Sequence, residues 1–153
     1  MFNIRLSNLK TIIMNKKILI AGIAGGILFF LLGWLIYGML LMDYMNHHAG
    51  LKGNINRSDA DLQMTYILAG SVLQGILLAF VLVRSNVKTV AEGVITGAVV
   101  GLLVSSSVDL SMYGTTYVFS KHSIVADVIA ATVISAIVGG VMVLVINAVG
   151  KKG

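Results

Sequence analysis

Residues 18–42 read ILIAGIAGGILFFLLGWLIYGMLLM and contain no charged side chain. At about 1.5 Å of rise per residue, an α-helix of this stretch is about 37 Å long, whereas the hydrocarbon core of a bilayer is about 30 Å thick. The stretch is too long for the apolar segment of a signal peptide, and no A-x-A cleavage site follows it. We therefore predict a transmembrane helix that remains in the mature protein.

Three further apolar stretches follow in the chain, and the third is the least apolar because Glu92 and the serines at 105–107 interrupt it. We predict one transmembrane domain, residues 18–150, preceded by a cytoplasmic tail, residues 1–17. The expected spans and the expected outer loop are, in order, residues 18–42, the loop 43–61, and residues 62–84, 89–108 and 124–149.

The composition also indicates a membrane protein. Of the 153 residues, 58% are hydrophobic and only 11% are charged, whereas a soluble domain carries about 25% charged residues. Too few polar residues remain to cover an apolar core in water, and a bilayer removes that need. We therefore predict an all-α integral membrane four-helix bundle. The chain has no cysteine, which excludes disulfides, thiolate catalysis and cysteine-ligated metals.

Two helix starts carry recognisable capping residues. Thr89-Val90-Ala91-Glu92 has the pattern of a capping box, in which a hydroxyl and a carboxylate each accept a bond from a free backbone N–H group. Ser123 precedes the last apolar stretch and is expected to cap its helix. These residues set the expected starts of the third and fourth spans.

The basic residues predict the orientation of the chain. Three of them, Lys52, Arg57 and Lys121, fall in loops on one side of the expected membrane. Because basic loops are retained in the cytoplasm, the side with more basic residues is expected to be cytoplasmic, and both termini then lie inside the cell. The eight basic residues of that side are Arg5, Lys10, Lys16, Lys17, Arg84, Lys88, Lys151 and Lys152.

The first residues leave two alternatives open. Met14-Asn15-Lys16-Lys17, placed just before the first apolar stretch, resembles the natural start of a membrane protein. Either Met14 is the initiator, or residues 1–13 form a loose amphipathic lead. The sequence does not decide between Met1 and Met14.

Small residues spaced by four predict how the helices meet. Lipid tails are as apolar as leucine, so helices in a bilayer associate through close packing and buried polar bonds. A stripe spaced by four winds around a straight helix, so we expect two or three successive members to share one contact. The expected packing residues are Gly22, Gly26, Gly93, Gly97, Gly101, Ala131, Ser135 and Gly139.

Three polar residues are candidates for chemistry inside the membrane. Asp127 lies in the fourth span, where a carboxylate is costly and often belongs to a proton or cation path, although its position near the helix start also suits an interfacial residue. Gln74 lies mid-span and is expected to line a path or to bond a neighbouring helix. Asp109 falls near the outer end of the third span. Tyr37 and the other outer aromatic residues are interpreted as an interfacial belt.

A weaker hypothesis concerns metal binding. If the first helix continues outward, Met39, Asp43 and His47 are spaced by four, and His48 follows. Histidine with methionine suits copper, and histidine with aspartate suits zinc. The spacing matches no known metal signature, so exposed loop histidines are the plainer interpretation, and we expect no cofactor.

Two segments resemble a known group of proteins. Gly25-Gly26-Ile27-Leu28-Phe29-Phe30-Leu31-Leu32-Gly33-Trp34-Leu35-Ile36-Tyr37-Gly38, and Asp127-Val128-Ile129-Ala130-Ala131 with Gly139-Gly140, are similar to segments of small four-span bacterial inner-membrane proteins. That group is labelled only as domains of unknown function. The resemblance covers residues 14–150 and implies a four-helix bundle in a bacterial inner membrane, with no activity and no site residues.

Three functions remain open from the sequence. The leading hypothesis is a non-enzymatic accessory or oligomeric component whose partners are lipid and a second copy or another membrane protein. The alternatives are a small transporter or channel subunit using Asp127 and Gln74, and a metal-responsive sensor. An enzyme is not expected, because no set of acid, base and nucleophile is visible. Nucleic acid is not an expected partner, since the basic residues behind the net charge of +5 flank apolar stretches.

Overall fold

The computed structural model describes residues 16–50, 57 and 59–150. The expectations for residues 1–15, including a start at Met14, and for Lys52, Lys151 and Lys152 lie outside the described residues. In the described part of the chain, every regular element is helical. The elements are α2 (Lys16–Leu35), the π-helix η1 (Ile36–Leu40), α3 (Met42–His47), the short 3-10 helix η2 (Asp59–Asp61), α4 (Met64–Arg84), α5 (Val90–Thr115) and α6 (Lys121–Gly150).

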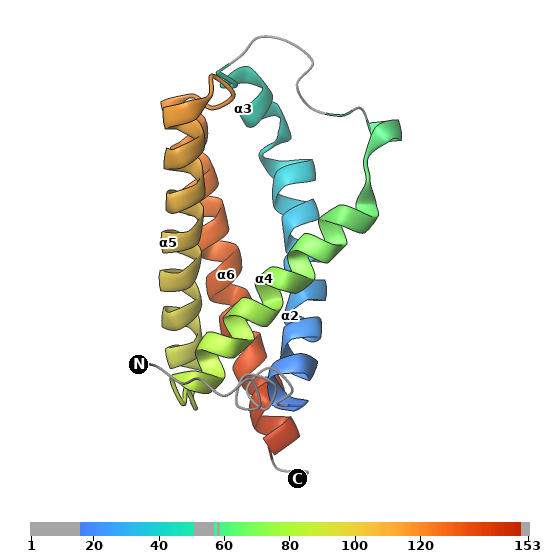
Figure 1. Cartoon of the computed structure of the whole chain (residues 1–153), viewed down its shortest axis with the longest axis vertical. Helices are drawn as coiled ribbons and strands as arrows, with labels where there is room; N and C mark the ends of the chain where they lie inside the picture. The colour runs from blue at the N-terminus through green and yellow to red at the C-terminus, as the bar shows by residue number, and fades with distance from the viewer. Residues whose placement is uncertain (1–15, 51–56, 58, 151–153) are drawn as a thin grey trace, which may run out of the picture.

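Four helical segments are long and apolar enough to cross a bilayer, and they pack as an all-α bundle (Figure 1). They contain 25 residues in α2 with η1, 21 in α4, 26 in α5 and 30 in α6. The prediction of a four-helix membrane bundle is confirmed at this level, and the chain is a multi-pass membrane protein.

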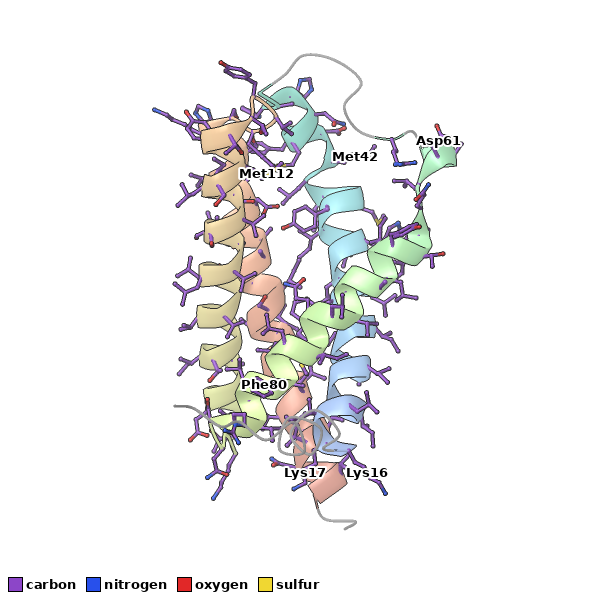
Figure 2. The ribbon with its side chains drawn as sticks, in the orientation of Figure 1. Lys16, Lys17, Met42, Asp61, Phe80 and Met112 are labelled. Carbon is purple, nitrogen blue, oxygen red and sulfur yellow. The ribbon has the colours of Figure 1, made fainter. Side chains whose placement is uncertain are left out.

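The two ends of the bundle differ in character. At one end, which we call the basic end, α2 and α5 begin and α4 and α6 finish (Figure 1). Lys16 and Lys17 lie at this end, whereas Met42 and Met112 lie at the other, which we call the α3 end (Figure 2). The side-chain amide of Asn147 on α6 donates to the Lys88 carbonyl oxygen over 2.9 Å and ties the α4–α5 turn to the end of α6.

The helices pack as two pairs, α5 with α6 and α2 with α4, and a contact between α2 and α6 joins the pairs. α5 lies against α6, and α2 lies against both α4 and α6. α4 runs obliquely across the bundle, so that only its second half joins the core, while every residue from Met64 to Gly70 is exposed (Figure 1). The buried core residues come from α2, α4 and α6: Ile18, Ala21, Phe29, Leu78, Ala79, Leu82, Ile134, Val138, Met142, Val143 and Ile146.

The helix starts agree with one capping prediction and correct the other. The Thr89–Glu92 capping box is confirmed: Glu92 N donates to Thr89 Oγ1 over 3.2 Å, and Thr89 N donates to the Glu92 carboxylate over 3.2 Å. The prediction that Ser123 caps the last helix is wrong, since α6 begins at Lys121. Ser120 occupies the cap and accepts from Ser123 N over 3.2 Å, while Ser123 Oγ accepts from Ser120 N over 2.9 Å.

The third span is longer than expected. α5 continues through its serines to Thr115, whereas the sequence predicts an end near Val108. Two of the serine hydroxyl groups are satisfied within the helix, each by a carbonyl oxygen one turn earlier: Ser105 Oγ donates to Gly101 and Ser111 Oγ to Ser107, both over 2.8 Å. Asp109 therefore lies within the helix.

The first span changes geometry before it ends. η1 is a π-helix in which Leu41 N donates to the Ile36 carbonyl oxygen over 2.8 Å, and a bend at Leu41 separates it from α3. The condition for placing Met39, Asp43 and His47 on one face, a continuous α-helix, is therefore not met, because a π-turn holds more residues than an α-turn and rotates the later residues about the helix axis.

Candidate intramembrane carboxyl site

The close contact between α5 and α6 is made by small residues at every fourth position. Gly97 lies against the Ser135 carbonyl and the Gly139 Cα atom, and Gly101 lies against the Ser135 side chain. Gly93 lies against Gly139 in turn. A step of four along α5 therefore matches a step of four back along α6, and the two helices keep one antiparallel register.

A second close contact joins α2 to α4. Gly75 of α4 lies against the carbonyl of Gly22 and the backbone of Gly26, and Gly26 in turn faces the Val72 Cα atom. Gly22 faces the backbone of Ile76. At each of these contacts at least one of the facing residues is a glycine without a Cβ atom, so the two backbones approach closely and fix where α4 crosses α2.

The same register brings two carboxyl groups together near the α3 end. Asp109 continues the stripe of Gly93, Gly97 and Gly101 on α5, and its carboxyl group lies within hydrogen-bonding reach of the carboxyl group of Asp127 on α6. Asp109 is only 4% exposed, and its Oδ2 atom is buried with no hydrogen-bond partner among the described residues. Asp127 is partly buried. The two candidate aspartates thus form one site, which we call the carboxyl pair.

A tyrosine from the π-helix completes the site. The Tyr37 hydroxyl donates to the backbone carbonyl oxygen of Asp127 over 3.4 Å, and it also lies near the side-chain carboxyl groups of Asp127 and Asp109. Tyr37 is partly buried and packs beside the apolar core. Three segments far apart in the sequence, η1, α5 and α6, therefore meet at the carboxyl pair.

The site lies inside the bundle, not at its surface. Asp109 is six residues before the end of α5 and Asp127 six residues after the start of α6, which places both about 9 Å from those helix ends. No lysine, arginine or histidine pairs with either carboxyl group among the residues that the structure describes. The two carboxyl groups and the Tyr37 phenol are suited to the reversible binding of a proton. A metal cation would need more oxygen ligands than these side chains provide.

The third polar candidate lies elsewhere. Gln74 is the central residue of α4, and its side chain is exposed, with no hydrogen-bond partner among the described residues. The structure therefore brings Asp109 and Asp127 together and leaves Gln74 on the outer surface. A path lined by both Asp127 and Gln74, the expectation for a transporter, is not formed within one chain.

The histidines gather at the α3 end without a metal-binding set. His48 stacks on Tyr44 with ring centroids 4.2 Å apart, and its Nδ1 atom lies 2.9 Å from the Tyr44 carbonyl oxygen. The His122 ring lies 5.6 Å from that of His48. Across residues 16–50, 57 and 59–150, no three histidine, cysteine or acidic side chains are placed to hold a metal ion, so His47, His48 and Asp43 are not gathered into such a group.

Comparisons with known proteins give no relative of this chain. No protein-family model matches the chain. No curated protein and no solved structure matches it significantly.

Sequence reasoning identifies both aspartates but misses their pairing and the role of Tyr37. The pairing has a signal, since Asp109 and Asp127 extend the two stripes of small residues by the same spacing of four. Tyr37 has none, because an outer-half tyrosine is the usual member of an interfacial belt, and no sequence feature marks the π-helix that presents it.

Proposed function

We propose that the protein is a non-enzymatic component of a bacterial inner membrane that works as a homo-oligomer through contacts between helices. The observation that supports this proposal is the exposed amide of Gln74 in the middle of α4. An amide that faces hydrocarbon has no water to bond, and burying it unpaired costs about 1–3 kcal/mol on the scale of protein mutations. A second helix that brings its own donor and acceptor removes that cost.

The surroundings of Gln74 favour a second copy of the same helix. Side chains on an α-helix lean toward its N-terminus, so Gln74 leans over Gly70, and nothing lies within 4 Å of where a Gly70 Cβ atom would be. The open notch at Gly70 admits another backbone. An amide carries both donors and an acceptor, so two copies of Gln74 related by a twofold axis satisfy each other. Leu73 and Leu77, both exposed, flank the contact.

Cross-linking in membranes tests the oligomer, and the absence of cysteine from the chain makes it simple. Leu73→Cys is expected to give a disulfide-linked dimer on mild oxidation. Adding Gln74→Leu, which removes the amide but keeps the bulk, is expected to weaken dimerisation about fivefold, because interhelical hydrogen bonds in membranes contribute about 1 kcal/mol.

Leu103→Cys is the matched control, since Leu103 is equally exposed on α5 but has no polar neighbour of this kind. A Leu73→Cys dimer no more abundant than the Leu103→Cys dimer would refute the proposed contact. Equal dimerisation with and without Gln74→Leu would refute the role of the amide.

The proposed orientation places both termini in the cytoplasm. Its support is that Lys16, Lys17, Arg84 and Lys88 all belong to the basic end, while Arg57 and Lys121 belong to segments at the α3 end. Basic residues are retained on the cytoplasmic side. In this orientation the carboxyl pair lies in the outer half of the membrane.

A further inference from the structure

We propose that the carboxyl pair of Asp109 and Asp127, with Tyr37, is a binding site for a single exchangeable proton that holds α5, α6 and η1 together. The inference is independent of the proposed oligomer, because all three side chains belong to one chain and Gln74 is not among them. The ligand of this site is the proton, and its binding holds the three helical segments together.

A hydrogen bond between two carboxyl groups requires a proton on one of them. An ionised carboxylate has only acceptors, so two of them cannot hydrogen bond to each other. The carboxyl groups of Asp109 and Asp127 lie within hydrogen-bonding reach of each other, and they can form that bond only if one of them carries a proton. Asp109 Oδ2 is buried without a partner, which costs far less for an oxygen of a neutral carboxyl group than for one of an ionised group.

Among the described residues, no positively charged side chain lies at the carboxyl pair. Two negative charges in contact away from water repel strongly, and they persist only with a cation or a proton between them. Among the described residues, the other titratable group that faces the pair is Tyr37 of η1, a neutral donor. α4 has no charged residue between Met64 and Val83, and the lysines of α2, Lys16 and Lys17, lie at the opposite end of the bundle. Because the described groups near the pair supply no positive charge, a proton is what offsets the repulsion between the two carboxylates.

The position of the site also supports a bound proton. Asp109 is buried, but Asp127 is partly exposed and lies about two turns from the helix end, so a proton can reach the pair from that side. Tyr37 donates to Asp127 from a π-helix, an arrangement often found where a helix has a functional role. Loss of the proton sets two charges against each other where η1, α5 and α6 meet, and it loosens that end of the bundle.

The proton gives the stability of the fold a defined pH dependence. In the unfolded chain both aspartates are ionised at neutral pH, so the folded chain binds one more proton than the unfolded chain. Stability must then fall as the pH rises, by at most about tenfold in the folding equilibrium per pH unit, until the folded pair itself releases the proton. Asp109→Asn/Asp127→Asn is expected to abolish this slope.

Infrared spectroscopy of the protein in phospholipid vesicles tests the proton directly, because protonated and ionised carboxyl groups absorb at different frequencies. At pH 7 the wild type is expected to show one protonated carboxyl per chain, lost on raising the pH. The band should vanish in Asp109→Asn, where the partly exposed Asp127 is left without its neighbour. Glu92→Gln, which alters an exposed carboxyl at the basic end, should keep it.

Three outcomes would overturn the assignment. They are no protonated carboxyl in the wild type at pH 7, a band that survives in Asp109→Asn/Asp127→Asn, and a band that disappears when sodium ions are added at constant pH, which would make the ligand a metal cation. If an asparagine variant fails to fold, the wild-type pH titration with and without sodium decides the matter alone.

Discussion

Gly97→Ala is expected to force α5 away from α6 and to destabilise the bundle by about 2–3 kcal/mol. A Cβ atom at this position collides with the Ser135 carbonyl oxygen and lies 2.9 Å from the Ser135 carbonyl carbon. These are backbone atoms, so no side-chain rotation relieves the overlap. The helices must separate along the stripe that leads to the carboxyl pair.

The effect can be measured with a buried thiol as a reporter. Ala130→Cys, on the buried face of α6, reacts with a thiol-specific fluorophore only when the bundle opens. We expect Gly97→Ala to lower the midpoint of thermal opening by about 10 °C. Gly114→Ala is the matched control, since nothing lies within 4 Å of a Cβ atom there and it also belongs to α5. Equal midpoints for the two variants would contradict the close α5–α6 contact.

Gly75→Ala is expected to have a comparable effect on the crossing of α2 and α4. The added Cβ atom lies 2.8 Å from the Gly26 Cα atom and also strikes the Gly22 carbonyl oxygen. Because α4 joins the core only through its second half, displacing this crossing removes most of its hold on the bundle.

Ala21→Cys on α2 reports this event, since Ala21 is fully buried. The midpoint for Gly75→Ala should again fall by about 10 °C, for the same overlap of backbone atoms. Gly33→Ala is the control on the partner helix, with open space around its Cβ position. A stable Gly75→Ala variant would mean that α4 does not cross α2 at these glycines.

The number and type of the long helices can be predicted from the sequence because the physics behind them is local. An apolar stretch long enough to span hydrocarbon must form a helix, since only a helix satisfies its own backbone groups there. The capping box at Thr89 is equally local, because it depends on residues only three apart. The Ser120 cap could have been recognised in the same way, since it bonds to Ser123 at the same spacing.

The oblique course of α4 and the π-helix at Ile36–Leu40 could not be predicted from local rules. Lipid and neighbouring helices are equally apolar, so hydropathy does not say which face of α4 meets α2. The sequence underestimates the length of α5 because its serines lower the hydropathy, although the hydroxyl groups of Ser105 and Ser111 bond within the helix.

The candidate site is an intermediate case. A straight helix would turn its stripe away after two or three members, yet Gly93, Gly97 and Gly101 all meet α6, and Asp109 continues the stripe. The reason is that two helices packed through their every-fourth-residue ridges cross at an angle that keeps those ridges together. Extending both stripes to the next polar residue finds the carboxyl pair, whereas nothing in the sequence points to Tyr37.

The central claim is that one antiparallel register along α5 and α6 sets Asp109 against Asp127 inside the bundle. The most direct measurement is bridging of Asp109→Cys/Asp127→Cys by the shortest bifunctional thiol reagents, in membranes, on a chain with no other cysteine. Efficient bridging within single chains is the expected result. Bridging no greater than in Asp109→Cys/Gln74→Cys, whose second position faces outward from α4, would contradict it.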